Sequence, residues 1–180
     1  MSNRQEWLAK VAAECPQCEI LDSKAERLIY AHGCYPVEYK WILQGEYPHL
    51  PEAVLRPSTV EEIQSILRLA NEDVVPLIPY GGGSGIVGGS IPEEQEVMID
   101  TKLLTDFSIN PINMTARGGA GLTGAEFENM LNEAGFTCGQ YPQSFQSAVM
   151  GGMVATRAIG TFSTKYGKMD DMVTALEVVL

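Results

Sequence analysis

The sequence lacks long apolar runs and has few basic residues. No stretch approaches the roughly 20 consecutive apolar residues that a membrane-spanning helix needs, so we expect no membrane span. Its 12 Lys and Arg residues stand against 23 Asp and Glu residues, a formal net charge of −11. This balance argues against nucleic acid as a partner, because phosphate neutralisation needs clustered cations. Residues 1–7 lack the apolar core of a signal peptide, and we therefore expect a cytoplasmic protein.

Cysteine and histidine are also scarce, with four and two residues. Cys15 and Cys18 form a C-x-x-C pair, but no second pair follows at zinc-site spacing, and the strand-then-helix context of a thioredoxin motif is missing. We interpret the pair as a turn; a redox or metal-binding role is the alternative. His32 and His49 lie outside every motif and are assigned to the surface or to packing. We predict no metal site.

Glycine, by contrast, is concentrated in one segment. Six of the nine residues from Gly81 to Gly89 are glycine, directly after the strand-like residues 74–78. Without Cβ atoms, consecutive backbone N–H groups can converge on one anion. The segment therefore predicts a site for a phosphate or pyrophosphate group. A purely structural turn is the alternative, although such a turn needs only one or two glycines.

The residues after the glycines indicate which kind of phosphate loop this is. Residues 83–88 match the G-x-G-x-x-G fingerprint of Rossmann folds, which requires a helix to follow directly. Residues 89–95 show no helical apolar period, and the next apolar run, 97–99, is strand-like. A P-loop is disfavoured even more strongly, because no Gly-Lys-Ser/Thr follows the glycines. We predict a loop that connects strand to strand.

The apolar periodicity and the capping residues predict alternating helices and strands. Helices are expected at residues 3–14, 22–30, 59–73 and 124–134, and from residue 148 onward. Strands are expected at residues 53–57, 74–78, 97–99, 114–118 and 172–180, with an ordered loop at 34–51 and an acidic turn region at 100–110. The strand, helix and strand between residues 53 and 78 are expected to form a parallel unit.

Small residues recur between Gly139 and Gly160. Gly151 and Gly152 lie in the helix expected from residue 148, where they allow a partner or a flat ligand to approach closely. Close helix packing alone is the alternative. Thr156 and Arg157 follow near the end of that helix, where a hydroxyl group and a cation can meet phosphate oxygens.

Several of these segments, taken in order, resemble the FAD-binding (PCMH-type) domain of the vanillyl-alcohol oxidase and p-cresol methylhydroxylase flavoproteins. The resemblance runs from about residue 53 to residue 180. It is carried by Arg56-Pro57, Thr59–Ile63, Pro79–Gly89, Tyr141–Ser144, Gly151–Ala158, and Tyr166-Gly167 before Asp170-Asp171.

The resemblance implies an α+β fold with two lobes: a small parallel β-α-β lobe, and a larger lobe with an antiparallel sheet flanked by helices. We therefore expect a helical N-terminal extension over residues 1–50 and an FAD-binding domain over residues 51–180. Within that domain, the first lobe is expected to cover about 51–105 and the second about 106–180, incomplete at its C-terminal end.

The resemblance also implies FAD as the cofactor, held between the lobes. Ser84 stands where some relatives carry the histidine that links flavin covalently, so noncovalent FAD is expected. Gln143 stands where many relatives carry Asp. The implied cofactor-binding residues are Pro79, Tyr80, Gly81, Gly82, Gly83, Ser84, Gly85, Pro142, Gln143, Ser144, Ser147, Ala148, Val149, Gly151, Gly152, Thr156, Arg157, Ala158 and Ile159.

Two branches of this superfamily are similar to the chain. One is the D-lactate dehydrogenase and glycolate oxidase group, which implies oxidation of a 2-hydroxy acid by hydride transfer to flavin N5. The other is the alkyldihydroxyacetonephosphate synthase group. In both, small-molecule substrates are bound mainly by a cap domain and a later segment, so we assign no catalytic residue here and expect no turnover from these residues alone. A homodimer or a partner subunit is a further expectation. The remaining alternatives are a non-catalytic FAD-binding module and an interaction protein whose glycine loop is structural.

Overall fold

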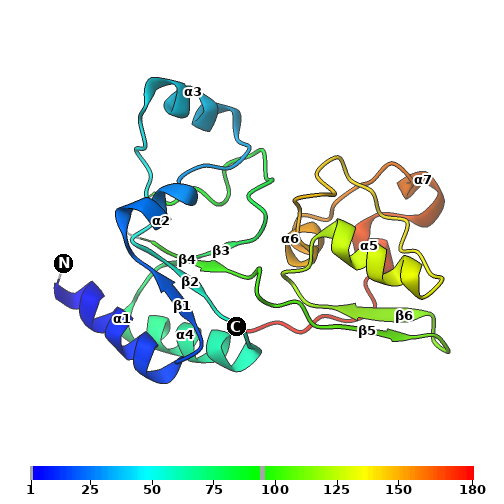
Figure 1. Ribbon diagram of the computed structural model, residues 1–180, viewed down its shortest axis with the longest axis horizontal. Helices are drawn as coiled ribbons and strands as arrows, with labels where there is room; N and C mark the ends of the chain where they lie inside the picture. The colour runs from blue at the N-terminus through cyan, green and yellow to red at the C-terminus, as the bar shows by residue number, and fades with distance from the viewer. Residues whose placement is uncertain (1, 94–95) are drawn as a thin grey trace. The chain divides into compact units, whose positions relative to one another are not determined.

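The structure, a computed structural model, describes residues 2–93 and 96–180 and consists of two compact units (Figure 1). The N-terminal unit comprises Met1–Leu103 together with Val178–Leu180, and the C-terminal unit comprises Leu104–Glu177. Each unit combines helices with one sheet, which confirms the expected α+β class. The sequence-based boundaries of the extension and the lobes stay predictions.

The N-terminal unit is built on a four-stranded sheet with the order β1-β2-β4-β3. The strands β2, β4 and β3 are parallel, whereas the edge strand β1 runs antiparallel to β2. The predicted parallel strand–helix–strand unit is therefore present, with β4 inserted between its two strands. The bounds of the strands are Glu19–Leu21 for β1, Ala53–Arg56 for β2, Leu77–Tyr80 for β3 and Val97–Asp100 for β4.

The alternation of side chains along these strands separates two apolar clusters, one on each face of the sheet. Leu55 and Val97 pack with Trp7 of α1 (Ser2–Glu14) and with Ile66 of α4 (Val60–Asp73). Val54 and Met98 pack on the opposite face against Tyr30, which follows α2 (Lys24–Ile29). Because successive residues of a strand point to opposite faces, both faces of β2 and β4 are buried.

The C-terminal unit is built on the antiparallel hairpin of β5 (Phe107–Asn110) and β6 (Thr115–Gly118). The Phe107 ring packs edge-on against the Phe127 ring of α5 (Gly124–Glu133), with ring centroids 5.5 Å apart. Three further helices follow in this unit. These are α6 (Met150–Ala155), α7 (Ser163–Tyr166) and α8 (Met169–Met172), of which α6 and α8 share the cluster of Ala148, Met153 and Met169.

The predicted helix starts are confirmed where the capping chemistry is local. The Thr59 side chain accepts a hydrogen bond from the N–H of Glu62 at the start of α4. Thr123 and Glu126 form the predicted capping box at the start of α5. Gly135, which follows α5, has a φ of +81°, a conformation that glycine adopts without strain.

Four sequence-based assignments are wrong. Residues 34–51 are not all loop, because Pro36–Gln44 form α3. Its large apolar residues Tyr39 and Leu43 are exposed, so its apolar residues do not mark a buried face. Within the expected turn region 100–110, Phe107–Asn110 form β5, whose alternating half-buried and exposed residues are a two-residue period. The expected strand at 172–180 is absent: Met172 ends α8, and residues 173–180 have no regular structure.

The fourth error concerns the strand expected at residues 74–78. Val74 is in the left-handed conformation with a φ of +54° and terminates α4, and the N–H of Val75 bonds to the carbonyl of Ala70. The strand therefore begins later, at Leu77, and Pro79 and Tyr80 belong to β3 rather than to the glycine loop. The short strand β1 was not predicted at all. No helix in the described part of the chain is long and apolar enough to cross a membrane.

Candidate functional site

The glycine loop leaves the carboxyl end of β3 and leads to β4 without a helix in its described residues. This confirms the predicted strand-to-strand connection and excludes the Rossmann arrangement. The N–H groups of residues 81–85 form no hydrogen bond with any other described residue. Because backbone donors of this kind otherwise need a partner, the loop presents a row of N–H groups that suits an anion.

Gly83 is the position in this loop where glycine is required. Its φ is +61°, and a Cβ atom there would lie 2.3 Å from the Tyr80 hydroxyl oxygen. Gly88 is also left-handed, with a φ of +76°, whereas a Cβ atom at Gly85 or Gly89 would meet nothing within 4 Å. The loop therefore depends on glycine at particular residues and tolerates side chains at others.

The segment between α2 and α3 contacts the loop, which sequence reasoning missed. A Cβ atom at Gly33 would lie 2.8 Å from the carbonyl oxygen of Gly83, so the two backbones approach closely. Glu38 of α3 is buried and accepts hydrogen bonds from the N–H groups of Gly33 and Tyr35, at 2.9 Å and 3.0 Å. The available signal was Pro36 followed by Glu38, residues that favour the first turn of a helix next to Gly33.

The second predicted set of site residues lies in the C-terminal unit. Pro142, Gln143 and Ser144 begin a turn in which the N–H of Phe145 bonds to the carbonyl of Pro142 and that of Ser147 to the carbonyl of Ser144. The side chain of Gln143 is exposed. The Ala148 and Val149 side chains are buried in the core, and the N–H and carbonyl of Ala148 are already hydrogen-bonded to Ser144 and Gly124.

Gly151 and Gly152 differ in their surroundings. A Cβ atom at Gly151 would lie 2.9 Å from the Cβ of Ala120, and the N–H of Gly151 bonds to the carbonyl of Ala120. These contacts favour the packing interpretation for Gly151. A Cβ atom at Gly152 would meet only Val149, at an ordinary 3.7 Å, so this position leaves room beside α6.

The residues after α6 include a hydrogen-bonded hydroxyl group and an exposed cation. The Thr156 hydroxyl donates to the carbonyl of Gly152 at 2.9 Å. Arg157 is exposed, has a φ of +51°, and forms no ion pair within the described residues. The carbonyl of Ala158 accepts hydrogen bonds from Gln140 and Met169, and the Ile159 side chain is exposed.

A buried carboxylate holds the segment that leads to Pro142, and sequence reasoning did not identify it. Glu128 of α5 is 3% exposed. It accepts hydrogen bonds from the Thr137 hydroxyl, the N–H of Cys138 at 3.0 Å and the Tyr141 hydroxyl at 2.8 Å. Glu128 therefore fixes residues 137–141 against α5.

The C-x-x-C pair is a turn, as predicted, because the N–H of Cys18 bonds to the carbonyl of Cys15. Both thiols are buried, and burial raises the pKa of Cys15 and raises that of Cys18 to about 12. A thiol with so high a pKa is almost entirely protonated at neutral pH and is a poor nucleophile. No group of metal-binding side chains occurs among the described residues.

Cys15 and Cys18 are expected to resist alkylation in the folded protein. At pH 8, a thiol with a pKa of about 12 has a thiolate fraction on the order of 10⁻⁴, which adds to the steric protection. Iodoacetamide labelling followed by mass spectrometry should modify the half-buried Cys34 first, and all four cysteines after denaturation. Labelling of Cys18 at the rate of Cys34 in the folded protein would contradict the buried turn.

A family profile described as "FAD binding domain" matches residues 51–180. The chain belongs to this family. It is an FAD-binding domain of the kind found in flavin-linked enzymes, and FAD is its cofactor, as the glycine loop and the later markers predicted. The fit rests here on the chain's own residues, namely the unbonded N–H groups of the glycine loop and the glycine required at position 83.

Two curated relatives represent the two predicted branches. The chain is 35% identical over 158 residues to an alkyldihydroxyacetonephosphate synthase of Caenorhabditis elegans, an alignment that covers 85% of the chain and 26% of the relative. It is 36% identical over 127 residues to a D-lactate dehydrogenase of Archaeoglobus fulgidus, which covers 71% of the chain and 28% of the relative. The chain thus spans little more than a quarter of these relatives' length.

Solved structures show the same fold. An alkyldihydroxyacetonephosphate synthase superposes with a TM-score of 0.90 at 29% identity, over 97% of this chain and 33% of that one. A substrate-bound p-cresol methylhydroxylase superposes with a TM-score of 0.76 at 20% identity, over 89% of this chain and 30% of that one. The predicted resemblance to PCMH-type domains is therefore confirmed.

Proposed function

We propose that the loop residues Gly81–Gly85 bind the pyrophosphate of FAD through their backbone N–H groups, and that Pro79, which has no N–H, and Tyr80 lead into this loop as the last residues of β3. The observation that carries this assignment is the run of N–H groups at residues 81–85 that lack partners among the described residues. A pyrophosphate needs several donors at once, and backbone amides supply them without lysine in a chain of net charge −11. Tyr80 belongs to β3, and its side chain contacts Gly83 of the loop.

In the C-terminal unit, we propose that residues 142–149 and 151–159 also contact FAD. The exposed side chains of Gln143 and Arg157 are available for polar contacts, and Gly152 leaves room for close approach. The buried Ala148 and Val149 and the half-buried Gly151 contribute packing. FAD is held noncovalently in this proposal, because Ser84 rather than a histidine stands in the glycine loop.

For the whole protein, we propose oxidation of a 2-hydroxy acid, with FAD accepting the hydride. The D-lactate dehydrogenase relative supports this assignment. A synthase of the alkyldihydroxyacetonephosphate type is the second candidate, supported by 35% identity over 85% of the chain. We assign no catalytic residue to these 180 residues, whose part in either reaction is to bind and orient the cofactor. We also propose that the whole protein binds a small-molecule substrate and that it forms a homodimer or associates with a partner subunit.

The protein is expected to bind FAD at a ratio of one to one and to release it on denaturation. Titration followed by flavin fluorescence, and then acid precipitation, measures both properties. FAD in the supernatant supports noncovalent binding, and flavin in the pellet contradicts it. If a folded sample shows no saturable binding, the proposed pyrophosphate site is wrong.

A second experiment separates the reactions. Anaerobic addition of D-lactate to the FAD-loaded 180-residue chain should leave the flavin oxidised. The longest product encoded by the gene should lose its flavin absorbance with D-lactate if it is a 2-hydroxy acid dehydrogenase. A flavin unchanged by D-lactate and by glycolate favours the synthase or a non-catalytic module.

A further inference from the structure

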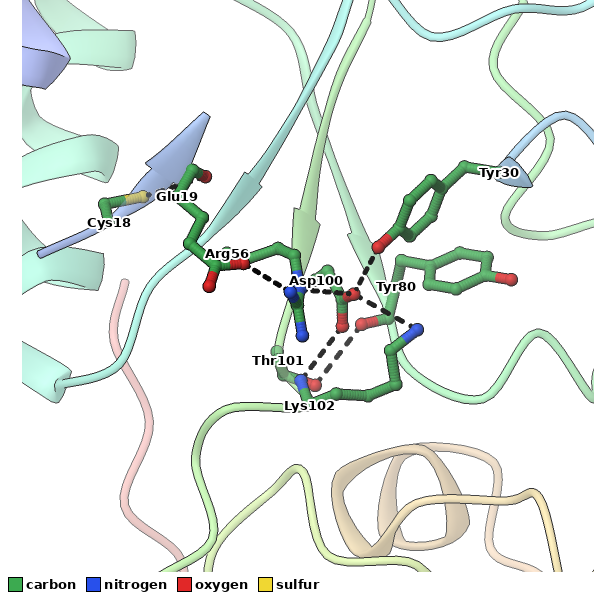
Figure 2. Close-up of polar contacts among 8 residues, drawn as sticks. All are labelled: Cys18, Glu19, Tyr30, Arg56, Tyr80, Asp100, Thr101 and Lys102. Carbon is green, nitrogen blue, oxygen red and sulfur yellow. Dashed lines mark hydrogen bonds and ion pairs between the residues drawn. The ribbon is translucent and has the colours of Figure 1, made fainter. Parts of the chain in front are cut away.

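A buried carboxylate lies beside the start of the glycine loop. Asp100 ends β4 and is fully buried. The polar side chains around it come from the carboxyl ends of the neighbouring strands and from the residue after α2 (Figure 2). Asp100 shares the sheet face of Val54, Met98 and Tyr30, because it continues the alternation of β4.

Two cations and two hydrogen bonds balance the charge of Asp100. The Tyr30 hydroxyl donates to Asp100 Oδ2 at 2.7 Å, and Lys102 Nζ lies 3.1 Å from the same oxygen. Arg56 Nε lies 3.3 Å from it and also pairs with Glu19 through its guanidinium group. The N–H of Lys102 donates to Asp100 Oδ1 at 2.9 Å. Burial, followed by the hydrogen bond to Asp100, raises the pKa of Tyr30, so its phenol stays a donor.

These partners of Asp100 also enclose Tyr80, the last residue of β3. The Tyr30 and Tyr80 rings meet edge to face with centroids 5.1 Å apart. Lys102 Nζ lies 5.1 Å from the centroid of each ring, which is within the range of a cation–π contact. Thr101, between Asp100 and Lys102, donates to the carbonyl of Tyr80 through its N–H at 3.0 Å and its hydroxyl at 3.3 Å.

Tyr80 in turn fixes the turn at Gly83. Its hydroxyl oxygen occupies the position where a Cβ atom of Gly83 would project, at only 2.3 Å. Gly83 therefore rests directly against the Tyr80 side chain in its left-handed conformation. A displaced Tyr80 ring would leave the N–H groups around Gly83 without their support.

We propose that Asp100 is a positioning residue for the cofactor loop, acting through Lys102 and Tyr30 on Tyr80 and thereby on Gly83. The proposal rests on the proposed function of the loop in binding FAD. Asp100 does not touch the cofactor in this account; it sets the shape of the loop before FAD arrives. Preorganised donors bind more tightly because less ordering is left to be done on binding.

The test removes the clamp on Tyr80 and leaves Asp100 in place, because loss of a buried carboxylate between two cations would also destabilise the whole unit. Lys102→Met removes the cation over both rings, and Tyr30→Phe removes only the hydroxyl that bonds to Asp100. Lys10→Met is the matched control, since Lys10 pairs with Asp73 at 2.6 Å within the same unit but outside the Asp100 cluster. Lys102→Arg restores the cation.

FAD affinity is expected to fall about tenfold in Lys102→Met, the scale of one well-formed cation–π contact, and about threefold in Tyr30→Phe. Lys10→Met should bind as the wild type does, and Lys102→Arg should recover most of the affinity. The thermal midpoint of the FAD-free protein should differ little between Lys102→Met and Lys10→Met. Amide exchange at Thr101, which bonds to Tyr80, should be faster in Lys102→Met.

Two results overturn the proposal: equal FAD affinity in Lys102→Met and the wild type, or a loss that Lys102→Arg does not restore and that follows the thermal midpoint. If the wild type binds no FAD, the proposed function of the loop fails. Amide hydrogen exchange at Thr101 then tests whether the Asp100 cluster positions Tyr80. An exchange rate that Lys102→Met leaves unchanged refutes that positioning role.

Discussion

Replacing Gly83 with valine is expected to reduce FAD affinity more than about 100-fold, beyond the effect of any single lost hydrogen bond. A Cβ atom at this position would meet the Tyr80 hydroxyl oxygen at 2.3 Å, and the φ of +61° is strained for a β-branched residue. Either the turn or the Tyr80 ring must move. In both cases, the backbone of residues 81–85 changes shape, and flavin fluorescence titration should show binding that no longer saturates.

Gly89→Val is the matched control for this substitution. It places the same side chain in the same loop, where a Cβ atom meets nothing within 4 Å and no left-handed conformation is needed. Its FAD affinity should stay within about threefold of the wild type, as expected of a surface substitution away from special backbone geometry. Equal binding by Gly83→Val and Gly89→Val would show that the turn at Gly83 does not form the pyrophosphate site.

Glu128→Gln is expected to lower the free energy of unfolding by about 3 kcal/mol, the cost of leaving buried hydrogen-bonding groups unpaired. The carboxylate accepts three hydrogen bonds, from Thr137, Cys138 and Tyr141. A glutamine amide offers one oxygen and turns its NH₂ group, a donor, toward other donors. Urea denaturation followed by circular dichroism measures the loss.

Glu133→Gln is the control for Glu128→Gln, because Glu133 is an exposed residue of the same helix. It should change the free energy of unfolding by less than about 0.5 kcal/mol, as most exposed substitutions do. If both variants unfold at the same urea concentration as the wild type, the buried carboxylate is not what holds residues 137–141.

The features that sequence reasoning predicted well depend on neighbouring residues. The caps at Thr59 and Thr123 use a side chain and an N–H group three residues apart, so their spacing is visible in the sequence. The glycine loop was recognisable from the sequence because few structures need so many glycines in so short a segment. FAD could be assigned as the cofactor because several short segments typical of the family occur in the expected order, and both candidate branches share them.

The features that were missed depend on contacts between distant residues. Gly33 and Gly83 are 50 positions apart, and Tyr30 and Asp100 are 70 apart, so no local pattern connects them. Helix α3 was missed because its apolar residues do not form one buried face: Leu43 and Tyr39 are exposed. The role of Gly151 was open for the same reason, since only the folded chain shows Ala120 against it.

The insertion of β4 between β2 and β3 has a consequence for how the N-terminal unit folds. The central strand of the parallel set comes last in the chain, so the set cannot be completed until the glycine loop has run from the carboxyl end of β3 to the amino end of β4. The entropy of closing this loop is therefore lost during folding, before any cofactor binds. A change that lengthens the loop should therefore slow the folding of the sheet itself. The loop that binds the cofactor thus also limits how fast the N-terminal sheet can form.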